Sequence, residues 1–436
     1  MYRWDQRRAC PQIRRDRKSL IIRDHYLGWT VGLGYVAPMF DKLSAVPPDA
    51  IMALMQQCQA DDRSKKVDLG VGVYKDAAGT VPIMRAVKTA EEAIIREEMT
   101  KTYVGTTGRV GFRDLVLDLV LGDNHPVRQT GRLASSQAAG GSGALRLGAQ
   151  LAFAADPDAT VWAPTPTWAN HIPLIGSAGF KLDNYPYYNR ETLGVDFEDM
   201  LTHLDKNAKP GDLVLLHGCC HNPTGADLSS GEWERLVPFL NERNLIPFVD
   251  LAYLGLGRGL DDDGYGLRLA LRDCPEVIFT VSASKNFGLY KERVGLLGVL
   301  CATEDHAAAV QSQLGAIQRT LISMPPDHGA KIVENILGNG DLKRMWLDEL
   351  TEMRDRMRGL RQLLSEALDV QGGEHIARAV IDQNGMFSML PVTKDQAVRL
   401  REEHAIYMTN SGRINIAGAN ASNIPAVAQA LLDVLS

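Results

Sequence analysis

One lysine stands where this sequence is best suited to covalent chemistry. Lys285 follows the apolar run 277–281 and lies between Ser284 and Asn286, in a segment that ends at Arg293. Most lysines are solvated surface residues, but a lysine just past a buried strand is held in a desolvated place. A desolvated amine is a good nucleophile for imine formation. The segment therefore indicates a lysine that reacts with a carbonyl group.

A carboxylate follows a second apolar run in the same way. Asp250 ends the run 245–250, and Tyr253 follows three residues later. A buried carboxylate is costly unless a cation lies beside it, so Asp250 predicts a cationic partner. The alternative, taking this stretch alone, is an aspartate that caps the N-terminus of a helix.

The segment 217–225 holds two histidines and two adjacent cysteines, which makes a metal site one alternative. Adjacent residues of an extended chain point to opposite faces, so Cys219 and Cys220 are not expected to share one tetrahedral ion. We interpret the segment as a strand end followed by an Asn-Pro turn that aims Asn222 at a ligand. No metal is expected.

Two features of the sequence are suited to binding anions. A glycine-rich turn, 140–143, precedes an expected helix over 144–155, and free N–H groups at a helix start, with the Ser142 hydroxyl, bind phosphate. No Gly-Lys-Ser/Thr follows, so the turn is not a P-loop, and an ordinary tight turn is the alternative. Arg319 and Arg413 would suit a substrate with two carboxylates, because guanidinium groups bind carboxylates in bidentate fashion. Taken alone, each is more often a surface arginine.

The elements that must position these residues form an α/β pattern. Apolar runs alternate with helical stretches, and their near-continuous apolarity predicts strands buried on both faces, as in a parallel sheet flanked by helices. Ligands of such sheets lie beyond the carboxyl ends of the strands, where the polar residues above are found. The runs are 67–74, 160–163, 213–217, 245–250, 277–281 and 294–300. Pro47-Pro48-Asp49 predicts a helix start at Ala50.

Composition limits the class of protein. The chain has 436 residues, 45% hydrophobic and 23% charged, with a net charge of -6, which is typical of a globular protein and not of one that binds nucleic acid or acidic membranes. No run approaches the roughly 18–20 apolar residues of a membrane span. The six cysteines are sparse for a chain of this length and include an adjacent pair, which favours a reducing compartment over a disulfide framework.

The N-terminus differs from the rest in charge. Residues 1–38 hold eight basic and three acidic residues, a net charge of +5, whereas the remainder carries -11. One interpretation is a targeting presequence. We favour a disordered tail, or a start codon chosen upstream of Met39, because the segment has acidic residues and no clear helical face.

Taken together, the segments resemble the class I pyridoxal-phosphate-dependent aminotransferases of the aspartate/aromatic type. The resemblance covers residues 39–436 and leaves 1–38 outside as an N-terminal extension. The stretches that carry it are 69–76, 101–103, 140–146, 165–171, 217–225, 250–253, 284–293, 384–388 and 411–413. It implies the type I fold of pyridoxal-phosphate-dependent transferases: a large domain with a mostly parallel sheet over 82–352, and a smaller α/β domain made of 39–81 and 353–436. It also implies a homodimer with shared active sites. The expected reducing compartment corresponds to a cytoplasmic location.

The resemblance assigns catalytic roles to residues already singled out. Lys285 would bind the aldehyde of pyridoxal 5'-phosphate covalently and then carry the substrate proton. Asp250 would keep the cofactor's ring nitrogen protonated, and His171 would orient Asp250. Tyr253 and Asn222 would hydrogen-bond the phenolic oxygen of the ring.

The remaining implied roles concern the cofactor's phosphate and ring and the substrate. The residues expected to hold the phosphate are Gly141, Ser142, Ser282, Ser284 and Arg293, with Tyr103 reaching in from the neighbouring subunit. Trp168 would stack on the ring. The α-carboxylate would bind Arg413, Asn222 and the Gly72 backbone, and Arg319 of the neighbouring subunit would meet a distal carboxylate.

Departures from the family pattern bear on specificity. Beside Arg319 the sequence reads Thr320-Leu321-Ile322, and Val81, Thr102, Ser142 and Met324 stand where strict aspartate enzymes tend to carry Thr, Asn, Thr and Asn. A less polar lining with a retained arginine predicts an enzyme that accepts Tyr and Phe as well as Asp and Glu. The alternative is a strict aspartate aminotransferase.

Rival hypotheses are another pyridoxal-phosphate chemistry such as decarboxylation, a non-enzymatic binding protein of the same fold, and a zinc protein.

Overall fold

The computed structural model describes residues 39–46, 49–122 and 124–435. The chain divides into two compact units, Met1–Pro47 and Pro48–Ser436. The described part of the first unit contains one short 3-10 helix, η1 (Met39–Lys42), with no buried residue. The predictions for residues 1–38 and for Pro47-Pro48 lie outside the described residues. None of the helices in the described ranges is long and apolar enough to cross a membrane.

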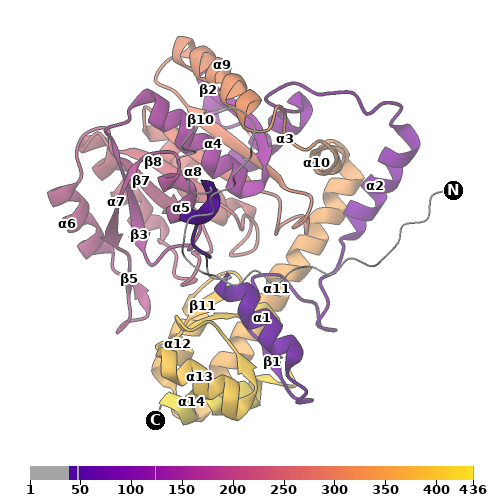
Figure 1. Cartoon of the computed structure of the whole chain (residues 1–436), viewed down its shortest axis with the longest axis vertical. Helices are drawn as coiled ribbons and strands as arrows, with labels where there is room; N and C mark the ends of the chain where they lie inside the picture. Colours follow the sequence, from indigo (N-terminus) through magenta and orange to yellow (C-terminus); the bar gives the residue numbers. More distant parts are fainter. Residues whose placement is uncertain (1–38, 47–48, 123, 436) are drawn as a thin grey trace, which may run out of the picture. The chain divides into compact units, whose positions relative to one another are not determined.

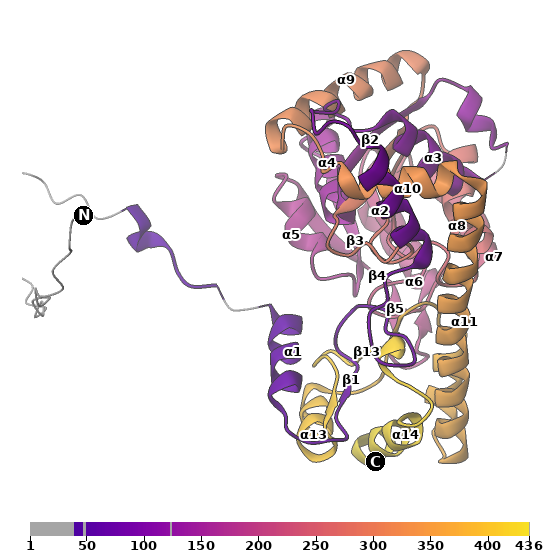
Figure 2. The ribbon, with the colours of Figure 1, turned by 90° about the vertical axis from the view of Figure 1, so that its right-hand side faces the viewer.

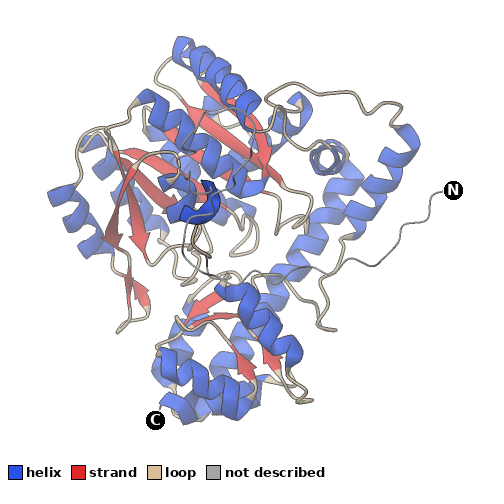
Figure 3. Ribbon diagram, in the orientation of Figure 1, coloured by secondary structure: helices blue, strands red, loops and turns tan. Residues whose placement is uncertain are grey.

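A seven-stranded sheet forms the centre of the second unit (Figure 3). Its strands, in the order β2-β10-β9-β8-β7-β3-β4, are β2 (Leu133–Ala139), β10 (Val294–Leu300), β9 (Val277–Ser282), β8 (Ile246–Leu251), β7 (Leu213–His217), β3 (Thr160–Thr165) and β4 (Lys181–Pro186). Neighbouring strands are parallel except that β10 is antiparallel to both β2 and β9. The predicted α/β fold with a mostly parallel sheet is therefore confirmed. The run 294–300 departs from the parallel pattern because no crossover helix separates β10 from β9.

Two strands of the sheet are missing from the sequence prediction, and one predicted run is mostly loop. The strand β2 is buried although it reads Leu-Ala-Ser-Ser-Gln-Ala-Ala, so it lacks the apolar signal that marks the central strands. The strand β4 is only partly buried. Within the run 67–74, only β1 (Val67–Asp68) is a strand, and it pairs in parallel with β12 (Ile406–Tyr407).

Helices cover both faces of the sheet (Figure 1). Successive side chains of β10, Leu296 and Leu297, enter different hydrophobic clusters. On the Leu297 face lie α4 (Gly140–Ala155) and α9 (Glu304–Leu321), and on the Leu296 face lie α3 (Val110–Leu121), α8 (Leu260–Asp273) and α10 (His328–Gly338). The other elements of this region are α2 (Arg85–Glu97), η2 (Pro126–Gln129), α5 (His171–Gly176), β5 (Tyr188–Asn189), β6 (Gly194–Val195), α6 (Phe197–Asn207) and α7 (Ser230–Glu242). The predicted helix start at Ala50 is confirmed by α1 (Ala50–Ala60), whose first turn donates two backbone hydrogen bonds to the Asp49 carboxylate.

A second hydrophobic core forms around the C-terminal part of the chain. The 31-residue helix α11 (Gly340–Val370) leads into it from the helices beside the sheet (Figure 2). The following elements are α12 (Glu374–Asp382), β11 (Phe387–Met389), α13 (Lys394–His404), β12, β13 (Arg413–Asn415), η3 (Ile416–Gly418) and α14 (Ile424–Leu435). Val67 and Leu69 join this core from the N-terminal side. The expected division at residue 352 therefore lies inside a continuous helix.

Candidate active site

A cavity of about 230 Å³ opens at the carboxyl ends of the central strands. Most of the residues that the sequence singled out line it together. They are Gly72, Gly141, Ser142, Trp168, Asn222, Asp250, Tyr253, Ser282, Ser284, Lys285 and Arg293. This grouping follows from topology, because parallel neighbouring strands end at one edge of the sheet.

Lys285 lies in the loop that follows β9. Its Nζ is 4.8 Å from the centroid of the Tyr253 ring. Burial lowers the pKa of Lys285 to about 8, with Asp250 acting to raise the pKa and Arg293 acting to lower it. A substantial share of the amine is therefore neutral near physiological pH, which is the form that attacks a carbonyl group.

Asp250 lies at the end of β8 with both carboxylate oxygens hydrogen-bonded. Thr280 Oγ1 donates to Oδ1 at 2.6 Å, and His171 Nε2 is 3.2 Å from Oδ2. Burial alone would raise the pKa of Asp250, but the contacts with His171 and Thr280 outweigh it and hold the pKa below its ordinary value. The cavity therefore has a fixed negative charge at its floor.

Histidines continue this network behind Asp250. The Thr167 hydroxyl lies 2.8 Å from His171 Nδ1 and 3.0 Å from Nε2 of His217. Burial lowers the pKa of His217 to about 3, so its ring is neutral. His217 ends β7 directly opposite Asp250 of β8. From the sequence, His217 was expected only as a possible metal ligand, although it ends an apolar strand in the same way as Asp250.

Asn222 connects two other polar side chains of the site. Its Nδ2 lies 3.4 Å from the Tyr253 hydroxyl, and its Oδ1 lies 3.4 Å from Arg413 Nη1. Arg413 also donates to the Gly70 carbonyl at 2.8 Å, and its guanidinium lies 4.4 Å from the centroid of the Phe387 ring.

Arg413 is a buried cation, and it forms no ion pair with any described residue. Its Nε has no hydrogen-bond partner among the described residues. Burial lowers the pKa of Arg413 from its ordinary value. A buried guanidinium without a counter-ion is suited to bind a carboxylate at a neighbouring cavity, of about 600 Å³, which Arg413, Asn222 and Trp168 line.

An oxyanion cradle lies at the start of α4. The helix begins at Gly140, four residues before the predicted start, and no side chain caps it. Gly140 has φ 72°, and a Cβ there would lie 2.4 Å from Arg293 Nη2, so glycine permits the close approach of the guanidinium. Free N–H groups at the N-terminus of a 16-residue helix, next to an arginine, bind phosphate-sized anions. Ser282 and Ser284 line the same part of the site.

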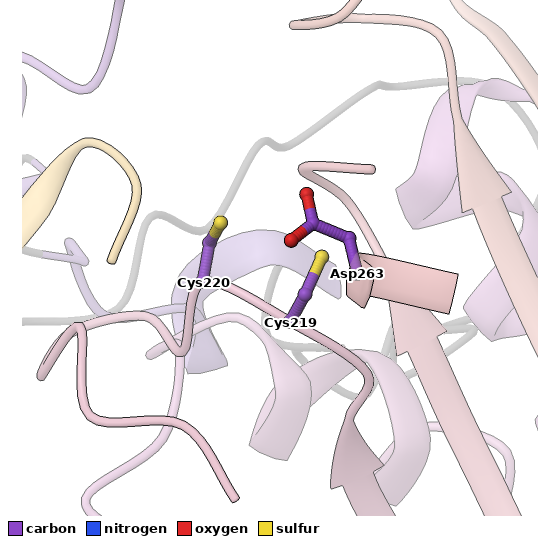
Figure 4. A group of neighbouring side chains, drawn as sticks. All are labelled: Cys219, Cys220 and Asp263. Atoms are coloured by element: carbon purple, nitrogen blue, oxygen red, sulfur yellow. The ribbon is translucent and has the colours of Figure 1, made fainter. Parts of the chain in front are cut away.

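The thiols of Cys219 and Cys220 do not point to opposite faces, as expected for an extended chain, but they still do not form a good metal site. Cys220 has φ 49°, so the chain is not extended there, and both thiols point to the same side as Asp263 (Figure 4). The three ligand atoms lie within 4.8 Å of one another. However, the Asp263 carboxylate accepts three backbone hydrogen bonds from residues 255–258, and a hydrogen bond with Cys220 together with burial raises the pKa of the Cys219 thiol. The histidines of the segment are not part of the group. The Asp263 carboxylate is therefore better explained as the hydrogen-bond acceptor that fixes the 255–258 loop than as a metal ligand.

Of the predicted site residues, His171 lies behind Asp250 and Arg413 lines only the neighbouring cavity, whereas Tyr103 and Arg319 line neither cavity within this chain. Tyr103 is 87% exposed, and Arg319 is an exposed residue of α9. Three further contacts of the site, Thr280, Tyr290 and Phe387, were not predicted from the sequence. Phe387 lay within a stretch of the resemblance but had no role, because its contact with Arg413 depends on how β11 pairs with β13.

Comparison with known proteins gives a consistent result. The family model described as class I and II aminotransferases matches residues 64–431. The aromatic-amino-acid aminotransferase of Paracoccus denitrificans is 44% identical over 91% of this chain and all of that protein, and the aspartate aminotransferase of Haemophilus influenzae is 40% identical over the same shares. The structure of an aromatic-amino-acid aminotransferase from Burkholderia pseudomallei, covalently bound to pyridoxal phosphate, superposes with a TM-score of 0.89 at 41% identity, covering 92% of this chain and 100% of that one.

Proposed function

We propose, from the premise that the chain belongs to the class I and II aminotransferase family, that it transfers amino groups from aromatic and dicarboxylic amino acids to 2-oxo acids such as 2-oxoglutarate. The observation that carries the proposal is a single cavity that holds a partly neutral lysine, a buried carboxylate and an anion-binding site at the start of α4 beside Arg293. These are the groups that a pyridoxal-phosphate-dependent transaminase requires.

The residues around the cavity fit pyridoxal 5'-phosphate as the cofactor. The cradle at Gly141 and Ser142 with Arg293 would hold the phosphate, and Lys285 would bind the aldehyde. When bound, the cofactor supplies a ring that withdraws electrons from the substrate Cα and a carbon that carries nitrogen between the two half-reactions. Trp168 would pack against the ring.

The chain's own groups then have distinct tasks. Asp250 provides a fixed negative charge for the ring nitrogen, and His171 holds its orientation. The Lys285 amine would take the proton from the substrate Cα and deliver it to the cofactor carbon that carries the nitrogen. Tyr253 and Asn222 would share their hydrogen bonds with the phenolic oxygen of the cofactor, while Arg413, with Asn222, fixes the α-carboxylate.

The pH dependence of cofactor uptake tests the state of Lys285. We expect the rate constant for uptake of pyridoxal phosphate by the cofactor-free protein to rise about tenfold per pH unit and to level off above pH 8, because only the neutral amine reacts. Stopped-flow absorbance would measure it. Since Asp250 acts to raise the pKa of Lys285, Asp250→Asn should move the midpoint to lower pH. A rate that still rises at pH 10 would show that Lys285 is solvated.

We further propose that two copies of the chain form each active site, with Tyr103 and Arg319 contributed by the partner. Exposed apolar side chains near both residues support this proposal. Ile95, Met99 and Tyr103 are 78%, 91% and 87% exposed, and Ile322, close to Arg319, is 45% exposed. Such surfaces are usually covered in an assembly.

A mixed dimer tests this arrangement and the role of Arg319. We expect Arg319→Leu to lower kcat/KM for aspartate by about a hundredfold, through loss of a charge pair, with little change for phenylalanine. Mixed dimers of one inactive Lys285→Ala chain and one Arg319→Leu chain, once isolated from the homodimers, should have about half of the wild-type aspartate activity, since one of their two sites keeps both residues. No recovery in dimers isolated with two affinity tags would argue against shared sites.

Substrate specificity is tested by half-reactions. In single-turnover experiments, aspartate, glutamate and phenylalanine should each change the absorbance spectrum of the bound cofactor. A kcat/KM for phenylalanine many orders of magnitude below that for aspartate would favour the alternative, a strict aspartate aminotransferase. Product analysis separates transamination from decarboxylation, because only transamination yields a 2-oxo acid together with a new amino acid.

We also propose the division into a large domain, 82–352, and a small domain, 39–81 with 353–436. The membership of Val67 and Leu69 in the C-terminal hydrophobic core supports it. A cytoplasmic location is proposed as well, supported by five free, buried cysteines among the described residues.

A further inference from the structure

Arg361, in the middle of α11, is buried without an acidic partner in contact. It is 2% exposed, and the five N–H groups of its guanidinium make six hydrogen-bond contacts at 2.6 to 3.3 Å, at least one N–H being shared between two acceptors. The acceptors are the carbonyl oxygens of Val380, Asn384, Gly385 and Phe387 and the hydroxyl of Ser388. A buried charge is costly unless its N–H groups are hydrogen-bonded, and four of the five acceptor residues here belong to the segment 384–388, so this arginine ties that segment to α11.

The segment that Arg361 holds carries the Phe387 ring into the site. The ring centroid lies 4.4 Å below the Arg413 guanidinium and 5.9 Å from the centroid of Tyr253. A Cβ built on Gly72 would lie 3.1 Å from Phe387 Cζ, so the loop that carries Gly72 rests on the same ring. Phe387 therefore contacts two residues proposed to form the substrate site, Arg413 and Gly72, and one proposed to bind the cofactor, Tyr253.

The same segment is attached to the turn that carries Asn222. The Asn384 N–H donates to the Gly225 carbonyl at 2.7 Å, and the Met389 N–H donates to the Thr224 carbonyl at 3.3 Å. A displacement of 384–388 would therefore move the Phe387 ring, against which the Arg413 guanidinium packs. It would also move the turn that carries Asn222, which hydrogen-bonds Arg413.

We propose that Arg361 is a positioning residue for recognition of the substrate α-carboxylate, acting through Phe387 on Arg413. The inference rests on the proposed function of Arg413. Arg361 has no access to the substrate, but under this proposal it contributes to the selectivity of the site for carboxylates. Because every amino-acid substrate has the α-carboxylate, the effect extends to all donors equally.

Three variants test the inference in the holoenzyme. Arg361→Lys keeps the positive charge but loses the planar fork, Phe387→Leu removes the ring beneath Arg413, and the double variant combines them. We expect Arg361→Lys to raise KM about tenfold for both aspartate and phenylalanine, with a smaller change in kcat. The double variant should be less impaired than the product of the single effects, because both changes act on one contact.

Leu368→Ala is the matched control for lost stability. Leu368 lies on the same helix, is fully buried in the C-terminal core, and is not among the hydrogen-bond partners of the segment 384–388. It should lower Tm at least as much as Arg361→Lys while leaving KM unchanged. If Arg361→Lys does not fold, Ser388→Ala removes one acceptor of the guanidinium, and the same shift in KM is expected on a smaller scale.

Binding of maleate, a dicarboxylate that cannot react, gives a second measurement by titration calorimetry. Arg361→Lys should weaken it by a factor similar to the rise in KM. Unchanged maleate affinity and KM, or effects of Arg361→Lys and Phe387→Leu that multiply independently, would overturn the inference and leave the proposed function intact. A wild-type protein that binds maleate but transaminates no donor would instead refute the proposed function.

Discussion

Replacing Lys285 with alanine is expected to lower kcat for aspartate and 2-oxoglutarate by at least about 10⁴-fold. Among the described residues that line the cavity, Lys285 is the only one with an amine. The variant therefore loses both the group that bonds the cofactor and the base that moves the substrate proton. The cradle at Ser142 and Arg293 and the charge of Asp250 remain, so we expect pyridoxal phosphate still to bind, with weaker affinity. Steady-state kinetics and equilibrium dialysis would measure the two effects separately.

Lys291 offers a matched control for this experiment. It lies in the same loop between β9 and β10 but is exposed and does not line the cavity. The Lys291→Ala protein should keep nearly full activity. Borohydride should attach the cofactor covalently to this variant as it does to the wild-type protein. Retention of a few per cent of activity in Lys285→Ala, or an equal loss in Lys291→Ala, would contradict the assignment.

The central part of the site was predictable because it depends on strand ends. Lys285, Asp250 and Asn222 follow apolar runs long enough to be recognised as buried strands, and parallel neighbours bring such ends to one edge. Topology alone then places an amine, an acid and an amide around one cavity. The same rule extends to His217, which the sequence analysis treated only as a metal ligand.

What the sequence did not reveal depends on contacts between distant segments. The strand β2 has small and polar residues that are buried only because helices cover both of its faces, so no local pattern marks it. The left-handed conformation of Cys220 reverses the direction of its thiol, which a rule for extended chains cannot anticipate. Arg361 looks like one of several arginines of an amphipathic helix until the segment 384–388 folds over it.

The second large effect is expected from Asp250→Asn, which keeps the shape of the side chain and removes its charge. Thr280 donates to one oxygen of the carboxylate and His171 Nε2 lies 3.2 Å from the other. The amide has one oxygen and one NH2 group in these places, so it can accept from one neighbour and donate to the other. The variant should fold and bind pyridoxal phosphate, but without a fixed negative charge the ring nitrogen is no longer held protonated. We expect kcat to fall by about 10²- to 10⁴-fold, with a much smaller change in KM, since the charge acts on the transition state.

Asp212→Asn and Asp250→Glu complete the test of Asp250. Asp212 is equally buried and accepts hydrogen bonds from the Thr160 N–H and the Trp162 indole, but it lies at the amino end of β7, away from the cavity. Its replacement should lower Tm and leave kcat per bound cofactor unchanged. Asp250→Glu keeps the charge and should retain more activity than Asp250→Asn, because electrostatics outweighs the altered reach of the side chain. If Asp250→Asn kept a tenth of wild-type kcat, or if Asp250→Glu were the weaker of the two, charge at this position would not be what drives the reaction.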